Sequence, residues 1–324
     1  MTNRRSLILS SLAMLGAPLA ACAQAAAPAW PSRPVRLLVG FPGGSTPDMA
    51  ARALAEALSH ALGQPVIVDN KPGASGNIVA DQVAKAGDDH TLGVLINGNL
   101  TSAKTLYAKL PYDPQRDFSY LSLLTTAPLL LLAPAGLPHG AGFFAEAKRQ
   151  GDAWNYGSVG NGSVAHLGME LLKAKTPGLK AVHVPFQGNP QVVTAMLGGQ
   201  IQMALVPPGV ALPHVKSGKL QAIGITSAHS ALAPEVAPLA DAGVADFSLE
   251  VWTALVGPAG LSRAAQARLL ALVPGLMQEP ATRQRLLVQG WDTVGSTPEM
   301  LQQRVKLETA EMTRIIKATG TRLD

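Results

Sequence analysis

The sequence predicts an α/β protein of two domains with a ligand cleft between them. Apolar runs of strand length alternate with amphipathic helical runs, the pattern of a parallel sheet flanked by helices. Several of the strands end in glycine-rich or polar turns, which gather at the carboxyl edge of an open sheet, where such folds bind ligands. Two similar segments, about 120 residues apart, suit a chain that leaves one domain for a second and later returns.

The first 25 residues have the pattern of a bacterial secretory signal peptide. Arg4 and Arg5 precede an apolar run, Leu7–Leu19, and small residues follow. The residues around Cys22 fit both an ordinary cleavage site and a lipoprotein site, and the arginine pair leaves export by the twin-arginine route open. We therefore expect a periplasmic protein, either free or lipid-anchored through Cys22.

Composition excludes several classes of function. The formal net charge of +5 becomes +3 when Arg4 and Arg5 are removed, and no run of Lys and Arg suggests nucleic acid as a partner. The longest later apolar stretch, Pro128–Ala133, is far shorter than the roughly 20 residues that span a bilayer. The single cysteine lies in the predicted signal, so the mature chain has no disulfide, thiol nucleophile or cysteine-based metal site.

The first turn follows the strand Val35–Val39 and opens a helix that extends to Leu62. Thr46 is predicted to cap this helix, and Asp48 complements the positive end of its dipole. Gly43 and Gly44 allow close approach of the backbone to a ligand, and free amides at a helix start favour an anion such as carboxylate or phosphate. A connection without a ligand fits this pattern equally well. The candidate residues in this turn are Phe41, Gly43, Gly44, Ser45 and Asp48.

Two further strand ends are expected beside the first. The strand Pro65–Val68 leads into the glycine-rich turn Asn70–Gly76, and the strand Thr91–Ile96 leads into a polar turn, Asn97–Ser102, that we expect to be flexible. Parallel strands would bring all three turns to one edge of the sheet. The candidates in the third turn are Asn97, Asn99 and Thr101.

Leu131–Leu137 and Leu255–Leu261 end in the same Pro-Ala-Gly-Leu sequence. We interpret them as hinge strands, with hinges at 133–135 and 257–259. Coincidence between two common loop compositions is the alternative. The predicted division is residues 1–25 as signal peptide, 26–136 with 251–324 as domain 1, and 137–250 as an inserted domain 2.

The inserted domain contains its own turn of the anion-binding type. The strand Trp154–Ser158 enters a glycine-rich loop, and Ser163 is the predicted N-cap of the next helix. His166 lies in the first turn of that helix, where the dipole favours neutral imidazole, either at a site or as a structural hydrogen-bonding residue. The candidates here are Ser158, Gly160, Gly162, Ser163, His166 and, in a later turn, Gln187.

The remainder, Ser262–Thr319, is predicted to form three helices that pack on domain 1, at 268–277, 281–289 and 298–316. A short strand within Trp291–Val294 is the one further element considered.

Enzymatic motifs find no match in this chain. Ser158 follows Gly157, but Tyr156 stands where a nucleophile elbow needs glycine. The chain has no Walker A run, no Gly-x-Gly-x-x-Gly after the first strand and no His-Glu-x-x-His. No histidines are spaced as paired metal ligands. We therefore predict no catalysis, no cofactor and no metal site.

Seven motifs in order give a resemblance to a known family. The chain resembles the substrate-binding proteins of tripartite tricarboxylate transporters, also called Bug proteins, from Trp30 nearly to its C-terminus. The motifs are Trp30-Pro31, Phe41–Gly44 with Asp48 and Arg52, Asn70–Gly76, Leu110–Pro114, Tyr156–Leu167, Val184–Gly188 and Leu197–Gln200.

The resemblance implies a two-domain periplasmic-binding-protein fold, type II-like, in a non-catalytic receptor. Such a receptor would close as a monomer on a small carboxylate and deliver it to inner-membrane permease subunits. Carried over, the resemblance implies that the amides around Gly43, Gly44 and Ser45, with Asp48 nearby, hold the carboxylate. The turn Asn97–Ser102 and the facing loop Ser158–Ser163 would complete the cleft. His166 and Gln187 would belong to its second wall.

Because the chain departs from the family pattern at three places, the identity of its ligand cannot be inferred from that of a relative. Leu100–Lys104 replaces His-Ala-Ile-Asn-Pro, Gln187 stands where lysine is common, and Val206 stands where aspartate is frequent. Without that aspartate a ligand ammonium would lack a partner. We therefore expect a carboxylate without an amino group, such as a di-, hydroxy- or aromatic acid.

Two alternative functions remain at this stage. A periplasmic sensor would use the same binding site with a signalling partner in place of a permease. A secreted hydrolase acting on an ester or amide is the alternative from another class.

Overall fold

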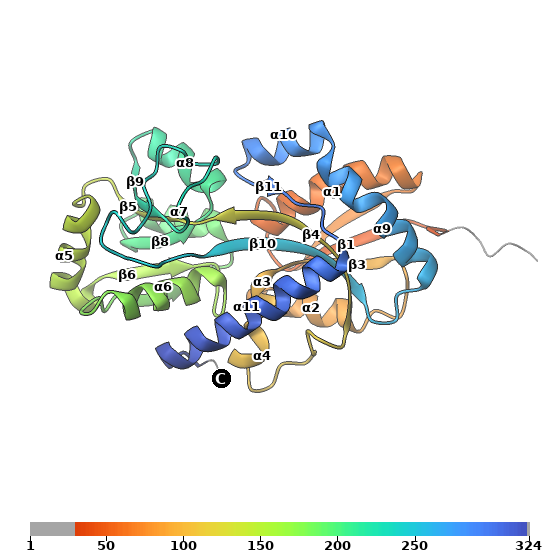
Figure 1. The fold of residues 1–324 in the computed structure, drawn as a ribbon, viewed down its shortest axis with the longest axis horizontal. Helices are drawn as coiled ribbons and strands as arrows, with labels where there is room; N and C mark the ends of the chain where they lie inside the picture. Colours follow the sequence, from red (N-terminus) through yellow and green to blue (C-terminus); the bar gives the residue numbers. More distant parts are fainter. Residues whose placement is uncertain (1–29, 323–324) are drawn as a thin grey trace, which may run out of the picture.

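The computed structural model describes residues 30–322, which form two α/β lobes side by side (Figure 1). The predicted signal peptide, its cleavage sites and Cys22 lie outside the described residues. Each lobe has its own sheet. The strand orders are β11-β4-β10-β3-β1-β2 in the first lobe and β7-β6-β8-β5-β9 in the second. The two-domain α/β fold expected from the sequence is therefore confirmed.

The first lobe combines a parallel half with antiparallel strands. β1, β2 and β3 are parallel, and β10 runs antiparallel between β3 and β4. Its strands are β1 (Val35–Val39), β2 (Val66–Asn70), β3 (Thr91–Ile96), β4 (Phe118–Pro128), β10 (Glu250–Pro258) and β11 (Asp292–Thr293). Its helices are α1 (Thr46–Leu62), η1 (Ala74–Gly76), α2 (Asn77–Ala84), α3 (Asn97–Leu100), α4 (Ala103–Leu106), α9 (Arg263–Gln278), α10 (Pro280–Val288) and α11 (Pro298–Thr319).

The second lobe is built in the same way around a smaller sheet. β6 is parallel to β7 and β8, whereas β5 is antiparallel to β8 and β9. Its strands are β5 (Leu130–Pro134), β6 (Asn155–Ser158), β7 (Val182–Pro185), β8 (Met203–Val206) and β9 (Leu220–Ile225). Its helices are α5 (Gly140–Gln150), η2 (Gly151–Ala153), α6 (Val164–Lys175), α7 (Asn189–Leu197) and α8 (Pro208–Lys216).

Burial explains why the strand and helix patterns could be recognised. Every residue of β3 and of β8 is buried, as expected for strands covered on both faces. In α1 the buried residues Ala50, Leu54 and Leu58 recur every four positions and pack on the sheet. Gly63 ends α1 in a left-handed conformation at φ 66°, which glycine adopts without strain.

The chain crosses between the lobes at two adjacent points. Leu129 lies between β4 of the first sheet and β5 of the second, and residues 226–249 return from β9 to β10. Thr226, fully buried, accepts from the Leu129 amide at 2.8 Å and donates to the Leu249 carbonyl at 2.6 Å. One hydroxyl therefore ties both crossings together.

These crossings differ from the predicted hinges at 133–135 and 257–259. Pro134 belongs to β5, inside the second sheet, and Pro258 belongs to β10, inside the first. The repeated Pro-Ala-Gly-Leu sequence marks the ends of β5 and β10 that lie away from the crossings, because proline and glycine stop a strand wherever it ends. The crossings lack this repeat: Leu129 is a single apolar residue, and residues 226–249 mix apolar, polar and charged residues.

The C-terminal helices agree with the prediction in number, and β11 is the short strand considered. The packing of α11 is broader than expected, however. Leu301 and Val305 join the core of the first lobe, whereas Met312, Ile315 and Ile316 join the core of the second. At 22 residues, α11 is about 33 Å long and reaches along both lobes (Figure 1).

The lobes also meet backbone to backbone where α8 approaches the turn after α10. A Cβ on Gly209 would lie 1.4 Å from the carbonyl oxygen of Gln289. One on Gly290 would lie 2.1 Å from the Gly209 amide nitrogen. Two glycines therefore permit a contact between lobes that no other pair of residues would allow.

We predict that Gly209→Ala keeps both lobes folded but disfavours this closed arrangement, because the added methyl group clashes with backbone that cannot rotate away. Small-angle scattering should give a larger radius of gyration than for the unchanged protein. Gly136→Ala is the matched control, since a Cβ there meets nothing within 4 Å. Identical scattering from all three proteins would contradict the assignment.

Candidate ligand-binding site between the lobes

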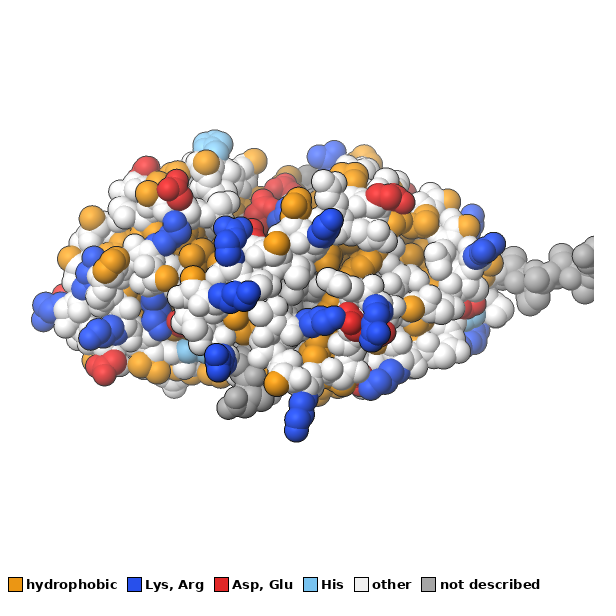
Figure 2. All heavy atoms as spheres, turned by 60° about the horizontal axis from the view of Figure 1, so that its bottom comes forward, with side chains coloured by type: hydrophobic (Ala, Val, Ile, Leu, Met, Phe, Trp, Pro, Cys, Tyr) orange, Lys and Arg blue, Asp and Glu red, His pale blue; other side chains and the backbone are white. Residues whose placement is uncertain are grey.

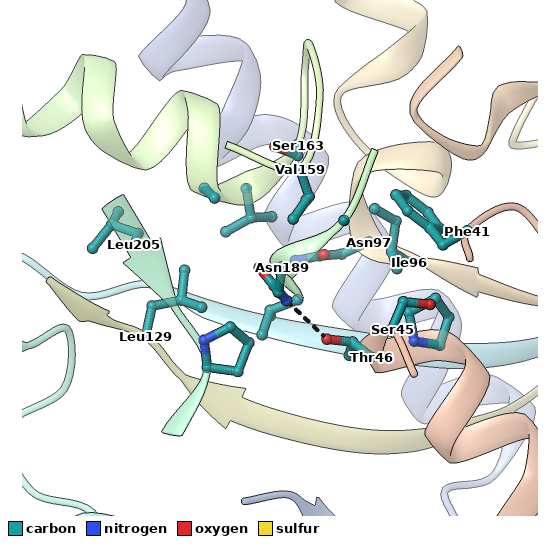
Figure 3. Close-up of a pocket in the computed structure, with 16 residues that line it drawn as sticks. Phe41, Ser45, Thr46, Ile96, Asn97, Leu129, Val159, Ser163, Asn189 and Leu205 are labelled. Atoms are coloured by element: carbon teal, nitrogen blue, oxygen red, sulfur yellow. Dashed lines mark hydrogen bonds between the residues drawn. The ribbon is translucent and has the colours of Figure 1, made fainter. Parts of the chain in front are cut away.

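A small cavity lies between the two lobes, lined by residues from both (Figure 3). Its volume is about 30 Å³, room for two or three water molecules. A ligand of several heavy atoms can therefore enter only when the lobes separate. The lining residues are Phe41, Ser45, Thr46, Pro47, Ile96, Asn97, Leu129, Val159, Ser163, Val164, Ala165, Gly188, Asn189, Leu205, Pro207 and Val251.

Hydrogen bonds across the cleft hold the lobes together around this cavity. The Ser102 hydroxyl donates to the Gly162 carbonyl at 2.8 Å, and the Tyr107 hydroxyl donates to the Asn161 carbonyl at 3.2 Å. On the other side, the Asn189 amide donates to the Thr46 hydroxyl at 3.4 Å, the bond drawn in Figure 3. The two lobes are therefore closed on each other.

The N-cap of α1 is Ser45, and the prediction of Thr46 is wrong. The Ser45 amide donates to the Pro42 carbonyl at 3.2 Å, which turns the chain one residue earlier than expected. The Ser45 hydroxyl makes no capping bond, is buried, and has no hydrogen-bond partner. It lines the cavity beside the start of α1, so it is a donor available to a ligand.

Asp48 stabilises this turn through hydrogen bonds and does not line the cavity. Its carboxylate accepts from the Gly44 amide at 2.9 Å, Arg52 Nε at 3.0 Å and Asn70 Nδ2 at 2.9 Å. Burial raises the pKa of Asp48, but these donors and the Arg52 charge outweigh it and hold the pKa below its usual range. The acid is therefore ionised and committed to the fold of the turn.

A second helix begins at the cavity from the opposite lobe. Ser163 caps α6 by accepting from the His166 amide at 3.2 Å, as predicted. Val164 and Ala165, the first residues of α6, line the cavity. The positive ends of α1 and α6 therefore face one space, and each favours a negative group.

His166 belongs to a stack of aromatic rings behind the glycine-rich loop. Its Nδ1 accepts from the Gly162 amide at 3.0 Å, and its ring stacks on His183 with centroids 4.0 Å apart. His183 in turn stacks on Tyr156 and contacts the Ser158 hydroxyl at 2.7 Å. Burial lowers the pKa of His166 to about 4 and that of His183 to about 3. Both rings are neutral at pH 7, and His166 supports the loop as an acceptor.

The third turn is ordered, and the expectation of a flexible segment is wrong. Residues 97–102 are buried and lie in α3 and the turn that leads to α4. The Asn97 amide donates to Glu308 Oε1 at 2.8 Å and to the Glu250 carbonyl at 3.1 Å. Asn99 donates to the Ser75 carbonyl and to Asn77 Oδ1, both at 2.9 Å. The Oδ1 atoms of Asn97 and Asn99 are left without partners.

The predicted site residues fall into three groups. Lining the cavity are Phe41, Ser45, Asn97 and Ser163. Lining adjoining crevices that share residues with it are Asn99, Gly160, Gly162 and Gln187. Lining none of these spaces are Gly43, Gly44, Asp48, Thr101, Ser158 and His166.

Sequence reasoning missed the apolar wall of the cavity. Ile96, Leu129, Leu205 and Val251 lie at strand ends or at the chain crossings, and their apolar character made them look like ordinary core. Asn189 was also missed, although it opens α7 directly after the predicted turn at Gln187 and faces Thr46. The one indication in the sequence that these residues could line a ligand site was their position near the end of a strand or the start of a helix.

The charges of the protein lie away from this cavity. No charged side chain of residues 30–322 lines it. Over the same range, no group of three or more His, Cys, Asp or Glu side chains could hold a metal ion. Figure 2 shows Lys and Arg side chains dispersed over both lobes on the face drawn. None of the described helices is long and apolar enough to cross a membrane.

Two lobes closing on a small cavity define a solute-binding protein, and sequence comparison identifies its family. The model of the tripartite tricarboxylate transporter family receptor matches residues 50–321, so the chain belongs to that family. It is 30% identical over 322 residues to the protein BugT of Bordetella pertussis, covering 96% of this chain and 98% of BugT. It is 32% identical over 295 residues to a protein of Pseudomonas sp. strain P51, covering 89% and 87%.

Solved structures of relatives share the fold. A protein of R. palustris with adipate has a TM-score of 0.86 at 28% identity, covering 90% of this chain and 98% of that one. MatC from Rhodopseudomonas palustris with bound malate has a TM-score of 0.83 at 30% identity, covering 89% and 100%. The periplasmic binding protein BugD has a TM-score of 0.84 at 25% identity, covering 90% and 99%. The resemblance found in the sequence is thereby confirmed.

We predict that Gly44→Ala lowers the free energy of unfolding by about 1 to 2 kcal/mol, because Gly44 has φ 78° and a side chain there is strained. Gly43→Ala is the matched control: its Cβ also meets nothing within 4 Å, and Gly43 is not in the left-handed region. Urea unfolding measures both. Equal stabilities would show that the turn does not need the left-handed residue.

A second prediction concerns acid pH. Because the folded-state pKa of His166 is about 4, against 6.5 when unfolded, the unfolded chain takes up a proton first as the pH falls. Stability present above about pH 6.5 is lost toward pH 4, and His166 alone should account for about 2 kcal/mol between pH 7 and pH 5.

Urea unfolding at these two pH values tests this. The pH-dependent loss should shrink by about that amount in His166→Asn, which keeps an acceptor for the Gly162 amide. The exposed His139→Asn should behave as the unchanged protein. A full loss in His166→Asn would contradict the assignment.

Proposed function

We propose that this protein is a periplasmic receptor that captures a small carboxylate between its lobes and delivers it to the membrane permease of a tripartite tricarboxylate transporter. It is proposed to act as a monomer. One observation carries the proposal: the unpartnered Ser45 hydroxyl lies in a small cavity at the start of α1. A carboxylate there would accept from Ser45 and from the free amides of the first turn.

Neutral donors suffice for such an anion if closure of the lobes around it excludes water. Charge-assisted hydrogen bonds are about twice as strong as neutral ones, and a low dielectric strengthens them further. The positive end of the α6 dipole faces the same cavity from the opposite lobe and would favour the second carboxylate of a diacid. The relatives described with adipate and malate support a carboxylate as ligand.

The expected lack of an amino group rests on a different residue from the one first considered. Val206 packs in the core of the second lobe, whereas its neighbours Leu205 and Pro207 line the cavity. Alternating side chains of a strand face opposite sides, which explains the difference. The wall of the second lobe is still without a carboxylate, so a ligand ammonium would lose its hydration without gaining a partner.

The cavity is compatible with a sensor but gives little support to a hydrolase. A sensor would use the same cavity, and its gene neighbours, a histidine kinase in place of permease genes, would separate it from a transport receptor. A hydrolase would need an accessible nucleophile. Ser158 does contact His183, but it is 1% exposed and does not line the cavity.

Mass spectrometry of small molecules released from natively purified protein tests the proposal most simply. We expect an organic acid without an amino group. Release of amino acids or peptides in stoichiometric amount would contradict it.

A calorimetric panel supplies the quantitative prediction. Succinate should bind at least about tenfold more tightly than aspartate, and 3-phenylpropanoate than phenylalanine, because an unpaired buried ammonium costs more than a neutral hydrogen bond returns. Consistently tighter binding of the amino partner would contradict the ligand class. Absence of binding by any acid tested would contradict the function itself.

A further inference from the structure

Asn97 lines the cavity, and its side-chain amide has a buried acceptor without a partner. It is 0% exposed and follows directly on β3. Both acceptors of its side-chain amide, Glu308 Oε1 and the Glu250 carbonyl, lie behind it. A reversed amide would turn Oδ1 toward these two oxygens. The nitrogen is therefore held by these two oxygens, Oδ1 is without a partner, and Asn97 is one of the residues that line the cavity (Figure 3).

The orientation of Glu308 is itself fixed by two donors. Trp252 Nε1 donates to Glu308 Oε2 at 2.5 Å, and Arg304 Nε donates to the same oxygen at 3.3 Å. Arg304 also bonds the Glu250 carboxylate at 2.8 Å. Glu308 Oε1 is therefore the oxygen available to Asn97, and α11 acts as the support of a residue at the ligand cavity.

A buried acceptor without a partner is costly, and a carboxylate cannot provide one. Ionised carboxylate oxygens only accept hydrogen bonds, so an acid held by Ser45 and the start of α1 would leave Asn97 Oδ1 unpaired. A hydroxyl on the ligand would donate to it. An ammonium would donate as well, but no carboxylate of residues 30–322 lines the cavity to pair with it directly.

The size of the cavity limits where that donor can be. Ser45 and Asn97 line the same cavity of about 30 Å³, so the groups that meet them must lie within a few atoms of each other. We propose that Asn97 selects hydroxycarboxylates, acids with a hydroxyl on carbon 2 or 3, and that Glu308 positions the Asn97 amide for this purpose. The inference rests on the proposed function and refines its ligand class.

Calorimetry with matched pairs tests the proposal directly. The pairs are malate and succinate, lactate and propanoate, 3-hydroxybutyrate and butyrate, and mandelate and phenylacetate, with both enantiomers of each hydroxy acid. Burial raises the pKa of Glu308, so the titrations are run at pH 8, which favours its ionised form. In the pairs that bind, one enantiomer of the hydroxy acid should bind about tenfold more tightly than its partner.

Two variants connect this preference to its residues. In Asn97→Leu the ratio of affinities within a pair should fall to about one, because no acceptor remains. Glu308→Gln removes the charge that holds the amide, so the ratio should fall by less while the cavity lining is unchanged. Glu308→Gln carries the test if Asn97→Leu fails to fold. Asn155→Ala is the control, since its amide bonds the Gln200 carbonyl outside the cavity, and it should keep the full ratio.

The possible outcomes distinguish the proposed hydroxyl selectivity from the proposed function on which it rests. Equal affinities within every pair that binds would mean that a resident water satisfies Asn97, which overturns the inference and leaves carboxylate capture intact. A hydroxyl preference that survives in both Asn97→Leu and Glu308→Gln would also overturn it. Absence of binding by every acid would overturn both.

Discussion

Exclusion of water from the space between the lobes is the constraint on which this structure depends. The cavity offers hydroxyls, amides and helix ends but no charged side chain among the described residues. Such donors compete poorly with water, and they hold an anion only where water cannot reach. Every device that closes the lobes therefore serves binding. These devices are the Ser102 bond to Gly162, the close contact of Gly209 with Gly290, and α11 packed on both cores.

The charged residues near the site do not line the cavity, but they form hydrogen bonds with residues around it. Asp48 ties the first turn to Arg52 and Asn70, Glu308 ties Asn97 to α11, and neutral His166 supports the loop before α6. Each fixes a backbone or amide group in or near the lining of the cavity. This division lets the cavity remain uncharged and still be rigid, so that selectivity depends on the direction of hydrogen bonds more than on net charge.

The features predicted correctly from the sequence are those that depend on residues close together in the chain. Alternation of strands and helices, the glycine-rich turns and the start of α6 at Ser163 follow from residues close together in the chain. Three features depended on distant residues and were misjudged. The crossings are Leu129 and residues 226–249, which Thr226 joins. The ordered third turn needs Glu308, which lies 211 positions from Asn97. The cavity wall uses Leu205 in place of Val206. Spacing along the chain contains no information on such pairings.

A crystal structure of the mature protein with the acid that it retains or binds most tightly would test the central claim most directly. The account predicts closed lobes, with a carboxylate oxygen within hydrogen-bond distance of the Ser45 hydroxyl and the Thr46 amide, and no Lys or Arg side chain on the ligand. A carboxylate bound to a basic side chain outside this cavity, or a ligand held with Ser45 still unpartnered, would contradict it.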